Sequence, residues 1–229
     1  MNTALLDNVF WHALTGAQAA LSAGTTRVRR YARGFSPIVA FAQPQAPDFD
    51  ALRPYCDVGE AFYVADWSGP VPMGWQLHAE ATMHRMVWDA GLPAEEPIEA
   101  LPLGPEHAAQ ALQLATLTKP GPFALRTIEL GRYWGVFESE GEGARLMAMA
   151  GERAHAGTLR EISGVCTHPD FQGRGLARRL MLKLLREELQ RGETPFLHVM
   201  RSNAAAHGLY LRMGFRDHAE PVVRVLANQ

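Results

Sequence analysis

The 229-residue sequence has little cysteine and little net charge, and both absences exclude classes of protein. The two cysteines, Cys56 and Cys166, lie far apart in ordinary apolar surroundings. This spacing argues against a disulfide framework and against a cysteine-based metal centre, so we expect no metal. The 22 basic and 24 acidic residues leave a formal net charge of −2. Such a balance provides no general attraction for nucleic acid or for an anionic membrane, and neither is expected as a partner.

Long apolar runs are also missing. No run approaches the length of a membrane span, and the first residues lack the basic and apolar regions of a signal peptide. We therefore expect a cytoplasmic protein. With 47% hydrophobic residues, the chain can bury the core of one large domain or of two modest ones.

A proline-rich acidic segment, Pro93–Pro105, marks the expected division of the chain. Its four prolines discourage helix and remove backbone donors. We expect an N-terminal α/β subdomain over residues 1–95 and a second domain over residues 96–229. In the first part, a strand–helix–strand order is predicted over Phe35–Ala42, Asp48–Tyr55 and Glu60–Trp67.

The second part alternates strands and helices more clearly, which predicts an α/β fold of the α+β type with a mixed sheet. Strands are expected over Ile98–Leu103, Leu130–Glu138, Arg145–Ala154, Leu159–His168, Thr194–Met200 and Val222–Leu226. Helices are expected over Pro105–Ala115, from Leu176 to Gly192 and from Asn203 to Gly214. A hairpin turn is expected at Ser139–Ala144, and a loop at Thr118–Phe123.

The loop before the longest expected helix resembles an anion site. Gly173 and Gly175 would let a ligand approach the unpaired N–H groups of a helix N-terminus, and Gln172 and Arg174 add donors at its rim. A phosphate is the natural ligand. The residues that follow exclude a P-loop, and a dinucleotide fingerprint would need a third glycine and an acidic residue. A glycine turn with no ligand remains the alternative.

Two motifs in order resemble the GNAT superfamily of acyl-CoA-dependent N-acyltransferases, and the resemblance covers about Ile98 to Leu226. The pyrophosphate motif Q/R-x-x-G-x-G/A is matched by Gln172, Gly175 and Ala177. The motif N-x-x-A-x-x-L-Y-x-x-x-G-F is matched by Asn203, Ala206, Leu209, Tyr210, Gly214 and Phe215. The architecture with an added N-terminal part is similar to the glycine N-acyltransferase type.

The resemblance implies acetyl-CoA, or another acyl-CoA, as co-substrate. The strand ending at Thr167 would splay from the strand at Phe196–Met200, and backbone groups of Val165 and Thr167 would pair with the pantetheine arm. The pyrophosphate would bind the loop residues Gln172, Gly173, Arg174, Gly175, Leu176 and Ala177. Asn203 would cap its helix, contact pantetheine, or do both.

Catalytic roles follow from the same resemblance. Tyr210 would protonate the leaving thiolate, its alternative being a core tyrosine with a satisfied hydroxyl. Glu161, expected on the same strand face as Val165, would be the general base, and its alternative is a surface carboxylate paired with Arg160 or Arg153. His168 and His198 are further candidates for proton removal, although His168 before a proline suits a turn. Cys166 would face away from Val165, which favours direct transfer without an acyl-enzyme.

The expected acceptor is a primary amine of a small molecule, amino acid or peptide. An α-amine costs only about 1.4 kcal/mol to deprotonate at neutral pH, against about 4.6 kcal/mol for a lysine-like amine, and so tolerates a weak base. The rival function is a CoA-binding sensor or scaffold without turnover. The loop Thr118–Phe123 is expected to form one side of the acceptor site, which residues before Pro93 would help to bound. A separate domain or a homodimer surface is the alternative for that N-terminal part.

Overall fold

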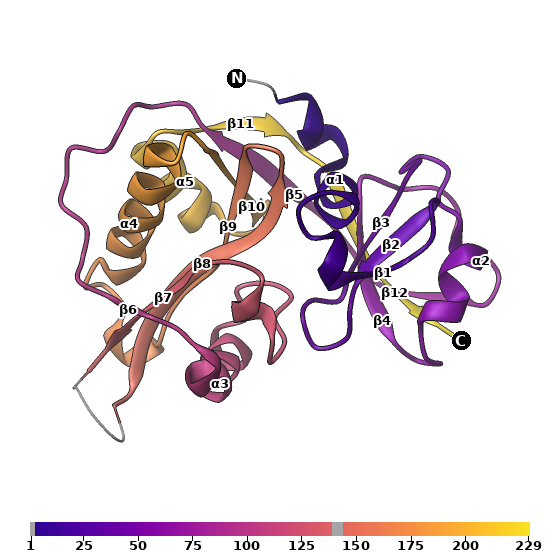
Figure 1. Cartoon of the computed structure of the whole chain (residues 1–229), viewed down its shortest axis with the longest axis horizontal. Coiled ribbons are helices and arrows are strands. Elements are labelled where there is room, and N and C mark those ends of the chain that lie inside the picture. The colour runs from indigo at the N-terminus through magenta and orange to yellow at the C-terminus, as the bar shows by residue number, and fades with distance from the viewer. Residues whose placement is uncertain (1–2, 139–143) are drawn as a thin grey trace.

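The computed structural model describes residues 3–138 and 144–229 (Figure 1). The expected turn at Ser139–Ala144 lies outside the described residues except for Ala144. Within these two ranges, every helix is too short or too polar to cross a membrane.

The strands of the described residues form a single mixed sheet in the order β1-β2-β3-β4-β12-β5-β10-β9-β8-β7-β6, with β11 also paired to β5. Two neighbouring pairs, β3–β4 and β9–β10, are parallel, and the others are antiparallel. The strands are β1 (Ser22–Gly24), β2 (Val28–Tyr31), β3 (Ile38–Phe41), β4 (Ala61–Ala65), β5 (Trp75–Trp88), β6 (Leu101–Pro102), β7 (Tyr133–Phe137), β8 (Leu146–Ala156), β9 (Leu159–Thr167), β10 (Thr194–Met200), β11 (Phe215–Ala219) and β12 (Val222–Asn228).

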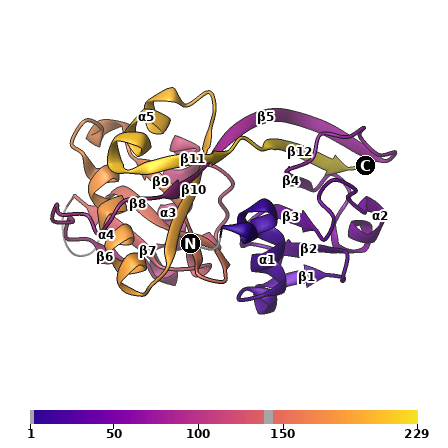
Figure 2. The same cartoon turned by 90° about the horizontal axis from the view of Figure 1, so that it is seen from above.

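Strand β5 joins the two halves of the molecule. Its first part pairs with β12, and its last part pairs with β10 on one side and β11 on the other. Figure 2 shows β5, β11 and β12 bridging the two lobes. Strand pairing therefore crosses the boundary expected near residue 95. Strands β4 and β5 precede that boundary in the chain, and they pair with β12 and β10, which follow it. The proline-rich segment leads from β5 into β6, which are separate strands of the same sheet.

Helices cover both faces of the sheet around β8–β10 (Figure 1). On one face, α4 (Leu176–Gln190) buries Leu180, Leu184 and Leu185 in a cluster that also holds Tyr210 of α5 (Ala204–Met213). On the other face lie α1 (Val9–Thr15) and α3 (Ala108–Thr118), which pack against β8. The short helix α2 (Phe49–Leu52) packs in the N-terminal lobe.

Most expected elements are confirmed. The helix predicted from Leu176 ends at Gly192 as expected, and the helix predicted after Asn203 is capped by that side chain. The region Pro105–Ala115 forms a 3₁₀ turn followed by α3. The strand expected over Ile98–Leu103 is reduced to β6. Helix α1 and the strands β1, β2, β5 and β11 have no counterpart among the elements predicted above.

Candidate active site

Within the described residues, the backbone N–H groups of Gly173, Arg174 and Gly175, in the loop before α4, have no hydrogen-bond partner. Gly173 and Gly175 adopt positive φ angles of 77° and 72°, and a Cβ added at either would meet no atom within 4 Å. Gly175 is the N-cap residue of α4, and no side chain of the described residues caps this helix. Residues 172–175 are exposed. The loop therefore has the open, amide-lined geometry that binds an anion at a helix N-terminus.

The sheet opens between β9 and β10, next to this loop. The two strands pair only from Thr194–Leu159 to Phe196–Glu161, although β9 continues to Thr167 and β10 to Met200. Beyond Glu161, the β10-facing edge of β9 has no strand partner within the described residues. The backbone groups at this open edge can hydrogen-bond an extended ligand in the way that they would bond a neighbouring strand. The expected positions Val165 and Thr167 lie in this part of β9.

A β-bulge at Gly164 changes which side chains of β9 share a face. From Ser163 to Cys166 the strand advances three residues while β8 advances two, and Gly164 has a φ of 64°. Because of this extra residue, Val165 packs in the cluster under α4, whereas Cys166 packs in the cluster under α3. Glu161 lies on the face opposite to Val165, so the expectation that these two share a face is wrong.

Glu161 lies in a closed network of charges and hydrogen bonds. Its side chain has no exposed surface and accepts two hydrogen bonds from Arg153, from Nε at 2.9 Å and Nη2 at 2.5 Å. His198 donates from Nδ1 to Glu161 Oε1 at 2.7 Å. Burial alone would raise the pKa of Glu161, but the Arg153 charge and these hydrogen bonds lower it to about 2. The carboxyl group is ionised, and the pairing with Arg153 that the sequence left open is present, inside the protein.

The tautomer of His198 follows from Arg85. The Arg85 Nε–H donates to His198 Nε2 at 3.0 Å, so His198 carries its proton on Nδ1. Burial lowers the pKa of His198 against the opposing effect of Glu161, which keeps the ring neutral. Phe10 of α1 stacks on the ring at 5.5 Å. Both ring nitrogens are occupied, so His198 has no free lone pair in this arrangement.

Tyr210 has a hydroxyl group free for other partners. Its side chain is nearly buried, and the hydroxyl makes no hydrogen bond to the described residues. Burial raises the pKa of Tyr210 to about 12, so the phenol stays protonated near neutral pH. Asn203, seven positions earlier, accepts from the Ala206 N–H at 3.1 Å. Capping by Asn203 is therefore confirmed.

His168 shapes its turn, as the sequence indicated. Its Nδ1 accepts from the Asp170 N–H at 3.2 Å, and its ring contacts Arg145. Cys166 is buried, and burial raises the pKa of its thiol to about 11, so little thiolate forms at neutral pH.

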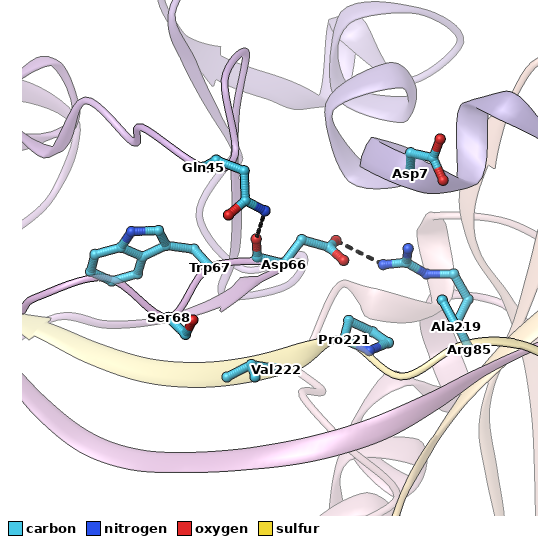
Figure 3. Close-up of a pocket in the computed structure, with 9 residues that line it drawn as sticks. All are labelled: Asp7, Gln45, Asp66, Trp67, Ser68, Arg85, Ala219, Pro221 and Val222. Carbon is cyan, nitrogen blue, oxygen red and sulfur yellow. Dashed lines mark hydrogen bonds and ion pairs between the residues drawn. The ribbon is translucent and has the colours of Figure 1, made fainter.

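A cavity of about 310 Å³ is lined in part by Arg85, the residue that also contacts His198 (Figure 3). Asp66, which has a φ of 65°, pairs there with Arg85 Nη2 at 2.8 Å. The residues that line it are Asp7, Gln45, Asp66, Trp67, Ser68, Arg85, Ala219, Pro221 and Val222. None of the residues expected to hold acyl-CoA lines this cavity. Sequence analysis did not identify Arg85 or Asp66. The available signal for Arg85 was an arginine directly before the apolar residues Met86, Val87 and Trp88.

Comparisons with known proteins agree with this geometry. The family described as FR47-like protein matches residues 134–224. A GNAT-family protein from Novosphingobium aromaticivorans DSM 12444 has 32% sequence identity and a TM-score of 0.84 over 98% of both chains. A GCN5-related N-acetyltransferase from Kribbella flavida shares the fold, with 15% identity and a TM-score of 0.63 over 94% of this chain and 93% of its own. No curated protein sequence matches. The identity and coverage of the first structure, together with the glycine loop and the open β9–β10 edge, show that the chain belongs to the GNAT family of acetyltransferases.

Proposed function

We propose that this protein transfers an acetyl or other acyl group from acyl-CoA to a primary amine, in a ternary complex. The observation that carries the proposal is the juxtaposition of the open edge of β9 with the uncapped N-terminus of α4. The open edge of β9 suits the extended pantetheine arm of acyl-CoA, and the N-terminus of α4 suits the pyrophosphate of the same molecule.

The acyl-CoA would lie along these two features. Main-chain groups of Val165 and Thr167 would pair with the pantetheine amides. Backbone N–H groups from Gly173 to Ala177 would hold the pyrophosphate, with Gln172 and Arg174 at the rim. The exposure of residues 172–175 supports this arrangement, since no atom of the described residues would contact a Cβ added at Gly173 or Gly175. The Asn203 side chain has its amide nitrogen left for pantetheine while its oxygen caps α5.

The acyl group would pass directly from acyl-CoA to the amine, without a covalent acyl-enzyme. The neutral amine nitrogen attacks the thioester carbon, the C–S bond breaks, and Tyr210 O–H protonates the departing thiolate. The attacking nitrogen releases its extra proton to water as the amide forms, and a proton from solvent restores the Tyr210 phenol. A hydroxyl that has no partner among the described residues and stays protonated near neutral pH supports that role for Tyr210. Cys166 packs on the opposite face with its thiol protonated, which argues against an acyl-enzyme.

The proton of the amine needs another route than direct transfer to Glu161. That carboxylate is fully buried, accepts from Arg153 and His198, and has a pKa lowered to about 2. We propose that Glu161 acts as a positioning residue that fixes the strand ends beside the opening. The amine would then lose its proton to water, which favours an α-amine over a lysine-like amine.

The acceptor would approach over the loop Thr118–Phe123. The Phe123 ring stands edge to face with Tyr133 at 5.9 Å, and both rings contact the bulge at Gly164. The following segment is tied to the N-terminal part, since Arg126 N–H donates to the Gly34 carbonyl at 2.8 Å. These contacts support the proposal that residues before Pro93 help to bound the acceptor site.

A panel assay tests this function. The protein is incubated with acetyl-CoA and with α-amino acids, polyamines or peptides carrying a free N-terminus, and free CoA and acylated product are measured. We expect amine-dependent CoA release, with α-amines ahead of lysine-like amines near neutral pH. Saturable acetyl-CoA binding without turnover on any amine would instead favour the sensor or scaffold function.

A further inference from the structure

Four ligand-type side chains from separate segments meet beneath α5. His84 lies on β5, His207 on α5 and Asp217 on β11, and Glu220 follows in the turn before β12. His207 Nε2 contacts the two oxygens of Asp217 at 2.9 and 3.1 Å. His84 Nδ1 lies 3.5 Å from Asp217 Oδ1 and 3.5 Å from Glu220 Oε1. One ligand atom each from His84, His207 and Asp217 fits within a span of 4.8 Å.

His84 gives this cluster an independent sign of a missing ligand. Its side chain is only 10% exposed, and within the described residues its Nδ1 has no hydrogen-bond partner. A buried polar atom without a partner is costly. The two imidazole rings stack at 3.9 Å and 6°, a geometry in which two positive charges would repel each other. Among the described residues, Arg201 pairs with Glu220 at 3.3 Å, whereas the side-chain partners of Asp217 are the two histidines.

We propose that His84, His207 and Asp217 bind a divalent transition-metal ion of the Zn²⁺ type, with Glu220 in reach of the fourth position. Bonds of about 2.0–2.2 Å in a tetrahedron separate neighbouring ligand atoms by about 3.4 Å. The 3.5 Å spacings of His84 Nδ1 from both carboxylates match that value, and they are too long for good hydrogen bonds. His207 Nε2 lies closer to Asp217, at 2.9 and 3.1 Å, and its ring is parallel to that of His84, so binding requires the His207 ring to turn until both lone pairs face the ion. Two carboxylates and two neutral imidazoles would balance the charge of the ion.

Binding would fasten α5 to β5 and β11. In the metal-free arrangement, the proton on His207 Nε2 points to Asp217, so binding moves this proton to Nδ1 and opens Nε2 to the metal. His207 stands three residues before Tyr210 on the same helix. The site is distinct from the proposed acyl-CoA loop, and its existence does not depend on the proposed function. The wide separation of its residues along the chain hides it from sequence analysis.

Titration of the chelator-treated protein tests the site. Calorimetry with Zn²⁺, and visible absorption with Co²⁺ as a spectroscopic probe, are measured for the wild type, His84→Gln, His207→Gln and Asp217→Asn. His78→Gln, a substitution of an exposed histidine on the same strand, is the matched control. We expect one equivalent of metal and a tetrahedral Co²⁺ spectrum for wild type and His78→Gln, and at least about 100-fold weaker binding for each cluster variant.

His207→Gln keeps the test valid if His84→Gln fails to fold, because the His207 side chain is 21% exposed. Its folding is checked by circular dichroism. Absence of saturable binding by the wild type would overturn the proposal. Binding by folded His207→Gln and Asp217→Asn within a few-fold of the wild type would overturn it as well.

Discussion

The buried pair between Glu161 and Arg153 gives a stability prediction that can be worked from the structure. Replacing Glu161 by Gln keeps the size of the side chain but leaves the guanidinium of Arg153 buried without its counter-charge. The pKa of Glu161 is lowered from 4.5 to about 2, and at about 1.4 kcal/mol per pH unit this corresponds to roughly 3 kcal/mol of stability. Breaking one partner of a buried ion pair typically costs about 3–5 kcal/mol. We expect Glu161→Gln to lower the free energy of unfolding by about 3 kcal/mol or more at pH 7.

The pH dependence has a definite sign. Because the folded-state pKa of Glu161 is lowered, its contribution is fully present above pH 4.5 and is lost as the pH falls toward 2. The gap in stability between wild type and Glu161→Gln should therefore narrow below pH 4.5. Urea unfolding followed by tryptophan fluorescence at pH 7 and pH 3.5 measures both quantities, provided that the m-value is unchanged.

The matched control is Glu129→Gln, the same substitution in an exposed ion pair with Arg126. Exposed pairs contribute little, so its unfolding curve should overlay that of the wild type. A loss of less than 1 kcal/mol for Glu161→Gln, or a loss equal to that of the control, would refute the buried-network reasoning.

Two further predictions concern catalysis. Tyr210→Phe should lower kcat by about 100-fold or more while the acetyl-CoA affinity stays within about two-fold, because the phenol acts only on the leaving thiolate; steady-state kinetics and calorimetry check this, and an unchanged kcat would remove Tyr210 from the mechanism. Phe123→Ala should raise the acceptor KM several-fold with unchanged acetyl-CoA affinity, while Leu125→Ala, an exposed neighbour, should leave both unchanged; equal KM values for the two variants would contradict the proposed acceptor wall.

Helices α3, α4 and α5 and the glycine loop were predictable from the sequence because their signals are local. Apolar spacing from Leu176 and the capping position of Asn203 are read within one or two turns, and both are confirmed. Strand β5 shows no such regularity. Its first part is largely exposed beside β12, whereas residues 83–88 are buried on both faces between β10 and β11. No two-residue alternation arises from such a change of surroundings, and the strand is invisible to periodicity.

The face and partners of Glu161 depend on contacts that lie far apart in the sequence. The bulge at Gly164 is set by pairing with β8, and it reverses the alternation that a regular strand would have. His198 joins Glu161 only because β9 and β10 are neighbours, and Arg85 joins His198 only because β5 follows on the other side. The sequence shows only that a glutamate stands at position 161. Its burial and its contacts with Arg153 and His198 depend on how the strands pair in the sheet.

The most direct test of the account is acetyl-CoA binding by Gly175→Glu and Gly192→Glu, compared with the wild type. The two glycines stand at opposite ends of α4, have φ angles of 72° and 73°, and would place a Cβ in open space. The strain of a side chain at positive φ is thus the same in both variants. Calorimetry should show wild-type affinity for Gly192→Glu and at least about 100-fold weaker binding for Gly175→Glu, whose carboxylate would occupy the pyrophosphate position. Equal acetyl-CoA affinity in the two variants would contradict the assignment of this helix N-terminus as the acyl-CoA site.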